Sequence, residues 1–153
     1  MCDCVNNVIL GFWGTFLVIY DVAHNPQATD SLFRSLIAHF PHRKIIAVMA
    51  LLKDKDSEQV IEALCPYAQQ LVCAEIPGHE SAPSAELANI GSKLGIESTS
   101  VQDIYLATEE VKQKLDDDSL LIIFGSHYFA ENVYDQFERS HPFSGSFKIK
   151  SLT

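Results

Sequence analysis

The sequence predicts a single α/β domain built on a mostly parallel sheet with helices on both faces, and three observations support this class. Four runs are apolar nearly throughout instead of alternating, as expected of strands that are covered on both faces. Segments with the periodicity of amphipathic helices separate these runs, and regular alternation of strand with helix is typical of Rossmann-like parallel sheets. The length of 153 residues, 47% of them hydrophobic, suits one core.

The elements follow one another in a regular order. The expected strands are 16–20, 44–51, 70–76 and 120–124. The expected helices are 26–40, 57–68, 84–94, 104–115 and 128–139. In the first helix, the apolar stripe that would pack on the sheet consists of Leu32, Phe33, Leu36, Ile37 and Phe40.

Capping and turn residues mark several limits of these elements. Asn25 is a good N-cap and Pro26 a good first residue for the first helix. Asp56 opens a capping box for the second helix. Gly95 ends the third helix, and the acidic run 116–118 makes a solvated turn before the fourth strand.

The two ends of the chain fit this pattern less well. Residues 1–15 form an atypical N-terminal segment, in which 8–12 are expected to make an edge strand. The last dozen residues, which include "HPFSGSF", are expected to carry either a short final strand or a loose tail. We therefore expect one domain over 16–153.

The charge and hydropathy patterns exclude two classes of partner. A formal net charge of −9, with arginine only at positions 34, 43 and 139, disfavours nucleic-acid binding, which depends on clustered basic residues. The uncharged segment 4–20 is short for a transmembrane helix, contains polar residues and glycines, and has no basic flank. We expect neither nucleic acid nor membrane as a partner.

Several common motifs are missing from the sequence. Cys2, Cys4, Cys65 and Cys73 lack the spacing of a structural zinc site, so we expect no metal and a reduced, cytoplasmic protein. The patterns G-x-S-x-G, G-x-x-x-x-G-K-[ST] and G-x-G-x-x-G are also absent. The chain therefore has neither a nucleophile elbow nor a phosphate-binding loop of its own.

Polar clusters follow three of the expected strands, at the point where each strand ends. "DVAHNP" follows the first strand, "KDKD" the second and "GSHY" the fourth. In an open parallel sheet, ligands bind outside the carboxyl ends of the strands, near the point where the strand order reverses. If the first strand lies between the second and the fourth, we expect Asp21, His24 and Ser126 to share one crevice at that point.

The first cluster also has a purely structural interpretation. Asn25 and Pro26 serve to begin a helix, which explains these two residues well. It does not explain Asp21 and His24, a carboxylate and an imidazole next to helix amides that favour an anionic ligand group. The ligand-binding and structural interpretations are evenly balanced on these residues alone.

In the other two clusters, some residues have a structural interpretation and others remain candidates for binding. Asp56 is better explained as a helix cap, whereas Asp54 and Lys55 remain available for a ligand or a partner domain. Gly125 lets the backbone turn sharply after its strand. Ser126 either caps the next helix, which is the commoner outcome, or donates to a carboxylate.

Taken together, the motifs resemble a known family. "LVIYDVAHNPQATDSL", "LLKDKDSEQ", "SAELANIG", "SVQDIYLA" and "LLIIFGSHYFAENVY" are similar, in this order and at these separations, to the C-terminal domain of the bifunctional dihydrofolate synthase/folylpolyglutamate synthases. These enzymes are members of the Mur ligase superfamily. The resemblance covers about 16–138 and implies a Mur ligase C-terminal domain fold.

The resemblance also implies a function. Enzymes of this family use ATP and Mg²⁺, bound mainly by a central P-loop domain, to join L-glutamate to dihydropteroate or folate. Because that domain is not in this sequence, we expect no catalytic residue and no cofactor in the isolated chain. Asp21, His24, Asn25 and Ser126 would bind substrate or nucleotide. Asp54, Lys55, Asp56 and Gly125 would lie near the nucleotide or the P-loop domain.

A second hypothesis is a stand-alone binding or interaction module that keeps the fold and has lost ligase activity. The family usually has a Gly-Arg segment just ahead of the first strand of this domain, where the arginine reaches the phosphates. This chain reads "ILGFWGTF" there, without an arginine. The missing arginine and the unfamiliar N-terminus are consistent with this second hypothesis, while the ligase domain stays the leading one, and the sequence leaves the choice between dihydropteroate and folate open.

Overall fold

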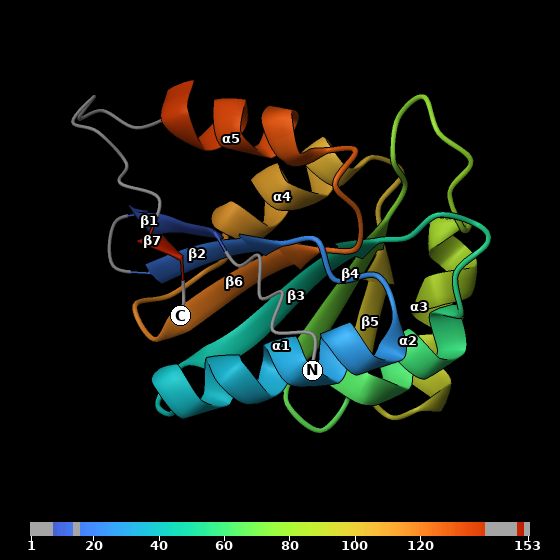
Figure 1. Cartoon of the computed structure of the whole chain (residues 1–153), viewed down its shortest axis with the longest axis horizontal. Coiled ribbons are helices and arrows are strands. Elements are labelled where there is room, and N and C mark those ends of the chain that lie inside the picture. Colours follow the sequence, from blue (N-terminus) through green and yellow to red (C-terminus); the bar gives the residue numbers. More distant parts are fainter. Residues whose placement is uncertain (1–7, 14–15, 140–149, 152–153) are drawn as a thin grey trace.

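The computed structural model describes residues 8–13, 16–139 and 150–151, and these form a sheet of seven strands with a helical layer on each face (Figure 1). Across the sheet, the strands run in the order β5 (Glu97–Ser100), β4 (Gln70–Ala74), β3 (Lys44–Ala50), β6 (Ser119–Phe124), β2 (Phe16–Asp21), β1 (Val8–Trp13) and β7 (Lys150–Ser151). The first five are parallel, and β1 is antiparallel to both of its neighbours. The predicted α/β class with a mostly parallel sheet is confirmed.

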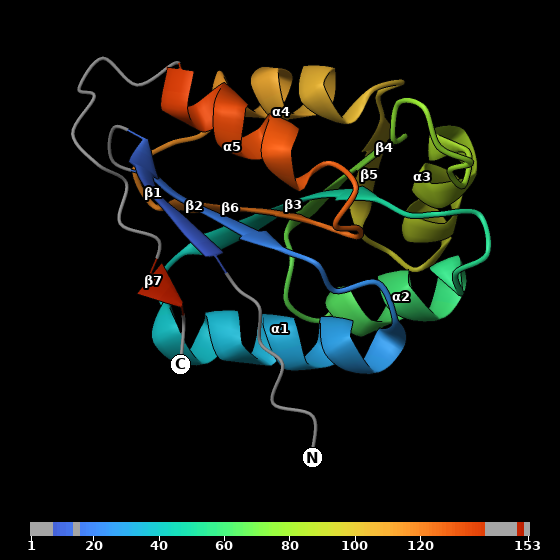
Figure 2. The same cartoon turned by 45° about the horizontal axis from the view of Figure 1, so that its top comes forward.

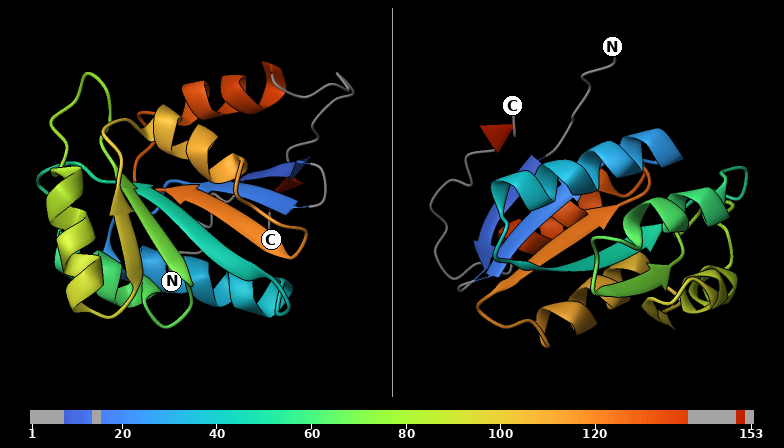
Figure 3. Two further views of the ribbon diagram at one scale, coloured as in Figure 1. Left: turned by 180° about the vertical axis from the view of Figure 1, so that it is seen from behind. Right: turned by 90° about the horizontal axis from the view of Figure 1, so that it is seen from below.

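Two helical layers cover the sheet, and each layer has its own core (Figures 2 and 3). One layer consists of α1 (Pro26–His39), α2 (Ser57–Leu64) and α3 (Ser84–Lys93). The other consists of α4 (Ile104–Lys112) and α5 (Ala130–Arg139). The predicted stripe of α1 holds in part, since Leu32, Phe33 and Leu36 are buried against the sheet while Ile37 is 37% exposed. Within the described residues, no helix is long and apolar enough to span a bilayer.

The strand order differs from the order assumed from the sequence. The first expected strand does not lie between the second and the fourth; instead β6, the fourth, lies between β3 and β2 and pairs with both. The crossover from β2 through α1 to β3 leaves one position open in the sheet, and β6 fills it. Its residues 120–124 have no exposed surface, as expected of the most central strand. The expected contact between the first and fourth strands is nevertheless present.

The edges of the sheet contain the elements that were hardest to predict. The strand β5, with the sequence ESTS, was missed because it is polar and largely exposed. The predicted strand near the N-terminus is β1, but it pairs with β7 on its outer side and so is not an edge strand. A short final strand is present as β7, whereas "HPFSGSF" lies outside the described residues. The division of the chain at residue 16 stays a prediction.

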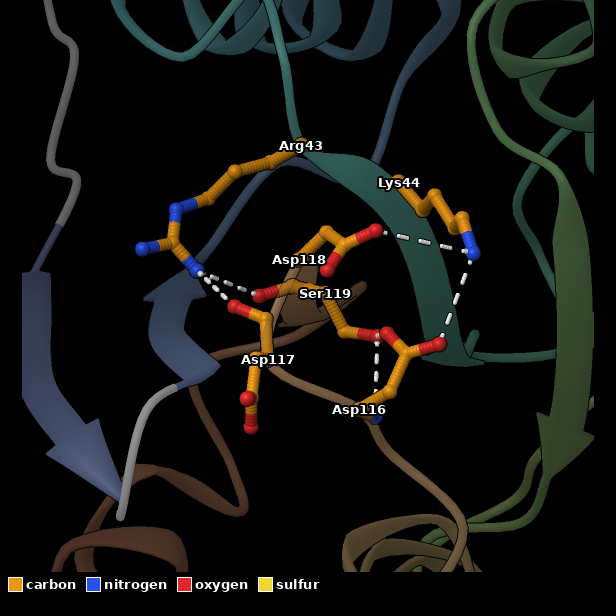
Figure 4. A network of polar contacts seen from close by, with 6 residues as sticks. All are labelled: Arg43, Lys44, Asp116, Asp117, Asp118 and Ser119. Carbon is orange, nitrogen blue, oxygen red and sulfur yellow. Dashed lines mark hydrogen bonds and ion pairs between the residues drawn. The ribbon is translucent and has the colours of Figure 1, made fainter.

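The amino-terminal end of β6 is fastened to that of β3 by a polar network (Figure 4). The guanidinium of Arg43 donates to the backbone carbonyls of Asp117 and Ser119, at 3.2 and 3.0 Å. The ammonium of Lys44 lies 3.4 Å from the carboxylate of Asp116 and 3.8 Å from that of Asp118. A hydrogen bond from Ser119 and the charge of Lys44 hold the pKa of Asp116 below its ordinary value. The predicted acidic turn is therefore exposed and also anchored.

Candidate functional site

The carboxyl ends of β2, β6 and β3 meet at one edge of the sheet. Phe124, the last residue of β6, pairs with Asp21 of β2 on one side and with Met49 of β3 on the other. The chain leaves β2 and β3 toward helices on one face and leaves β6 toward α5 on the opposite face (Figure 1). The connections therefore diverge at β6, and open α/β sheets bind ligands at such a point.

Asp21 places a buried carboxyl group at this edge. It is the last residue of β2 and is 5% exposed. Its Oδ1 accepts a hydrogen bond from the backbone amide of Ala23 at 2.6 Å. Burial raises the pKa of Asp21 to about 6, although the bond from Ala23 acts in the opposite direction. A carboxyl group that titrates this close to neutral pH is typical of functional sites.

His24 is an exposed residue in the loop between β2 and α1. Its Nδ1 lies 2.9 Å from the backbone carbonyl oxygen of Val22. Because a carbonyl oxygen can only accept, Nδ1 carries the proton in this bond, and Nε2 of the neutral ring is then an acceptor. Among the described contacts, Val22 rather than Asp21 therefore orients the imidazole.

Asn25 has the structural role that its position predicts. It is the N-cap of α1, with extended backbone angles, and its side-chain oxygen accepts from the amide of Ala28 at 2.8 Å. Its backbone carbonyl accepts from both the amide and the hydroxyl of Thr29, at 3.0 and 2.8 Å. Pro26 is the first helical residue. A contact between Asn25 and a ligand stays a prediction.

Gly125 and Ser126 turn the chain away from β6 at the same edge. Gly125 has φ of +125°, and a Cβ added there would lie 1.9 Å from the carbonyl oxygen of Ala50, the last residue of β3. Only glycine allows this close approach. Ser126 is buried, and its hydroxyl oxygen accepts from the amide of Tyr128 at 3.2 Å, which leaves the hydroxyl proton for donation.

The loop after β3 contains the third predicted cluster. Asp56 is the N-cap of α2, and its Oδ1 accepts from the amide of Gln59 at 3.1 Å, as predicted. The ammonium of the partly buried Lys55 lies 3.9 Å from the carboxylate of Asp54, which is exposed, so this pair stabilises the fold little. These side chains lie at the same edge as Asp21 and Ser126. Contacts of Asp54, Lys55 or Asp56 with a ligand or a partner domain stay predictions.

Comparison with known proteins identifies the family. A family profile described as "Mur ligase, glutamate ligase domain" matches residues 8–127. The chain belongs to this family. It is 30% identical over 114 residues to a dihydrofolate synthase/folylpolyglutamate synthase of Buchnera aphidicola, a match that covers 72% of this chain but only 25% of that protein. The chain thus spans about a quarter of the length of this relative.

Solved structures give the same relationship. A bifunctional folylpolyglutamate synthase/dihydrofolate synthase from Yersinia pestis, complexed with AMPPNP and Mn ion, superposes with a TM-score of 0.67 at 29% identity, covering 76% of this chain and 27% of that one. A bifunctional enzyme of the same description with Mn, AMPPNP and L-glutamate bound gives a TM-score of 0.69 at 28% identity, covering 80% and 29%. The predicted resemblance is confirmed.

In this glutamate ligase domain, a group of exposed rings extends the edge beyond the predicted residues. The imidazole of His79, in the loop after β4, stacks on the phenol ring of Tyr128 with centroids 4.1 Å apart. His127 lies on the same phenol ring at 4.3 Å. This group could not be predicted from the sequence, because His79 and Tyr128 lie in loops that follow different strands and no spacing rule connects them.

The loops after β3 and β4 are joined to each other. Leu52 and Ser81 form an isolated antiparallel bridge, and the amide of Lys53 donates to the carbonyl of Glu80 at 3.0 Å. Ser81 also accepts from the amide of Ile76 at 2.7 Å. The ring group and the lysine-containing loop are therefore parts of one connected surface at this edge.

Two pockets among the described residues are lined by neither Asp21 nor Ser126. One, of about 110 Å³, is formed between α4 and the strands β3, β4 and β5, with Thr99 and Lys114 in its lining. The other lies between α1 and α2. The structure thus brings Asp21 and Ser126 to neighbouring strand ends with His24 in the adjoining loop, while their sharing of a single crevice stays a prediction.

Proposed function

We propose that this chain is the C-terminal, glutamate-side domain of an ATP-dependent folate–glutamate ligase of the dihydrofolate synthase/folylpolyglutamate synthase type, acting in the cytoplasm. The observation that carries the proposal is the position of Asp21, His24 and Ser126. They lie at the ends of neighbouring strands in a chain that belongs to the glutamate ligase domain family. The relatives named for this activity, and the neighbour solved with L-glutamate, support it.

The proposed reaction has two steps. ATP first phosphorylates a carboxylate of dihydropteroate or folate, which gives an acyl phosphate and ADP. The amine of L-glutamate then attacks the acyl carbon, the C–O bond to phosphate breaks, and the amine loses a proton as the amide forms. Holding the amine close to the acyl carbon is an entropic contribution to catalysis, and this domain would supply it.

The side chains at the edge suit an amino acid. Nε2 of His24 is an acceptor that can take a hydrogen bond, and then a proton, from the attacking amine. The hydroxyl of Ser126 can donate to a glutamate carboxylate, since its oxygen already accepts from Tyr128. Asp21 adds an acceptor next to the cationic form of the amine. Each group thus fits one part of the zwitterion.

The part of the chain that the structure describes does not by itself fit the metal that the family uses. Among residues 8–13, 16–139 and 150–151, no group of three or more His, Cys, Asp or Glu side chains is placed to hold a metal ion. The proposal therefore assigns Mg²⁺ and the phosphates of ATP mainly to a P-loop domain.

The decisive experiment is reconstitution with the P-loop portion of a related dihydrofolate synthase/folylpolyglutamate synthase. We expect the chain alone to release no ADP, because phosphoryl transfer needs metal and phosphate ligands. We expect the mixture to release ADP only when both L-glutamate and dihydropteroate or folate are present. If this chain binds neither the P-loop portion nor glutamate, the result would instead support a module without ligase activity.

A second measurement tests the role of His24. In the reconstituted enzyme, His24→Ala should lower kcat/KM for glutamate about 10- to 100-fold, because the acceptor for the amine is lost. The melting temperature should hardly change, since the side chain is exposed. The matched control is His42→Ala, an exposed histidine in the turn before β3, at the opposite end of the sheet. Equal activities of the two variants would remove His24 from the site.

A further inference from the structure

We infer that Tyr20 is a positioning residue that holds the loop of Ser126 beside Asp21 and thereby sets the affinity for L-glutamate. The inference rests on the proposed function and names a residue that the motifs do not include. It depends on a contact between the two loops of the site, which follow β2 and β6. The sequence gives no sign of this contact, because Tyr20 reads only as an apolar strand residue.

Tyr20 is fixed in place by the layer that contains α5. It precedes Asp21 in β2, and its side chain is 1% exposed. Its ring makes edge-on contacts with Phe129 and Tyr134, each with centroids 5.7 Å apart. Successive strand residues point to opposite faces, so Tyr20 and Asp21 lie on different sides of the sheet. The ring contacts therefore hold the phenol of Tyr20 in a fixed orientation on the face of the sheet that is covered by α5.

The phenolic hydroxyl of Tyr20 donates a hydrogen bond to the backbone carbonyl oxygen of Ser126. In the ladder, Tyr20 is paired with Ile123, so this bond reaches three residues past its strand partner into the loop. The carbonyl of Ser126 is thus tied to β2, while its hydroxyl oxygen is tied to the amide of Tyr128. The two bonds set the orientation of the serine that would face the glutamate carboxylate.

The hydroxyl is kept in the form that can donate. Burial, with smaller contributions from the nearby Tyr134 and Asp21, raises the pKa of Tyr20 well above its ordinary value. The phenol therefore stays protonated throughout the pH range in which the amine of glutamate reacts. The hydroxyl of Tyr20 therefore still donates to the carbonyl of Ser126 when Asp21 becomes charged.

Tyr20→Phe isolates this role, because it removes only the hydroxyl and leaves the ring in the core. In the reconstituted enzyme, we expect KM for L-glutamate to rise about five- to tenfold, with kcat and KM for ATP changed less than twofold. The matched control is Tyr134→Phe, which alters a second phenol in the same ring cluster. We expect its KM for glutamate to equal that of the unmodified enzyme.

Amide hydrogen exchange of the chain alone gives a readout that does not need activity. We expect Tyr20→Phe to speed exchange at residues 126–129 several-fold, and Tyr134→Phe to leave this loop unchanged. Unchanged exchange in Tyr20→Phe would contradict the inference that Tyr20 positions the loop of Ser126. Faster exchange with an unchanged KM for glutamate would contradict the inference that the position of this loop sets the affinity for L-glutamate. If the unmodified reconstituted enzyme is inactive, the proposed function fails, and the exchange result alone decides whether Tyr20 positions the loop.

Discussion

Replacing Gly125 with alanine is expected to lower the free energy of unfolding by about 3–5 kcal/mol, which is a large part of the stability of a domain of this size. Two effects add at this position. The φ of +125° is strained for any residue with a side chain, and the new Cβ would overlap the carbonyl oxygen of Ala50 at 1.9 Å. Ala50 is the last residue of β3 and position 125 directly follows β6, so neither of the overlapping atoms can move without shifting a central strand.

Gly78→Ala is the matched control for this experiment. Gly78 also has a positive φ, +78°, but nothing lies within 4 Å of an added Cβ. Its loss should be about 1 kcal/mol, from backbone strain alone. Urea denaturation of the three proteins measures the difference, and similar losses for the two variants would show that β3 and β6 separate easily at this edge.

Asp21→Asn is expected to stabilise the fold and to damage the ligase. At pH 7.5, the free energy of unfolding should rise by about 1–3 kcal/mol, because asparagine removes a buried charge and keeps an oxygen for the Ala23 amide. In the reconstituted enzyme, kcat/KM for glutamate should fall about 100-fold, because the carboxylate that we propose to lie next to the amine is lost. A gain in stability joined to a loss of activity is expected of a residue kept for function.

The pH dependence of unfolding gives an independent check that the carboxyl group of Asp21 is buried as a charge at neutral pH. The folded protein holds the pKa of Asp21 at about 6, above the unfolded value of 3.8, so the folded state binds the proton more tightly. The cost of the buried charge is therefore absent below pH 3.8, grows between pH 3.8 and 6, and is complete above pH 6. The stability difference between Asp21→Asn and the unmodified chain should shrink when unfolding is measured at pH 4.5 instead of 7.5. A difference that does not depend on pH would mean that Asp21 is not buried as a charge.

The central part of the fold could be predicted because its signals are local. The run 120–124 is apolar at every position, which only a strand covered on both faces requires, and it is fully buried in the structure. The caps at Asn25 and Asp56 could be predicted for the same reason, since a cap bonds within one turn of its own helix.

The remaining features depend on contacts between distant parts of the chain. The strand β5 was missed because its position comes from pairing with β4 and not from its own polar sequence. The order of the strands was assumed wrongly because two parallel arrangements satisfy the same crossover rule. In the candidate site, the position of Asp21 and Ser126 at neighbouring strand ends could be predicted from where each strand ends, whereas the bond from Tyr20 and the stacking of His79 require the folded chain.

The polar network of Figure 4 also has a consequence for the opposite end of β6. Arg43 holds the first residue of this strand, and the close approach of Gly125 to Ala50 holds the residue after its last. The strand is thus pinned at two points about 20 Å apart, and a slip of one residue would turn every side chain to the other face. Arg43 and the acidic turn thus fix the register of β6 at its amino-terminal end. In this way they also fix the position at which Ser126 leaves the sheet, although they lie at the other end of the strand.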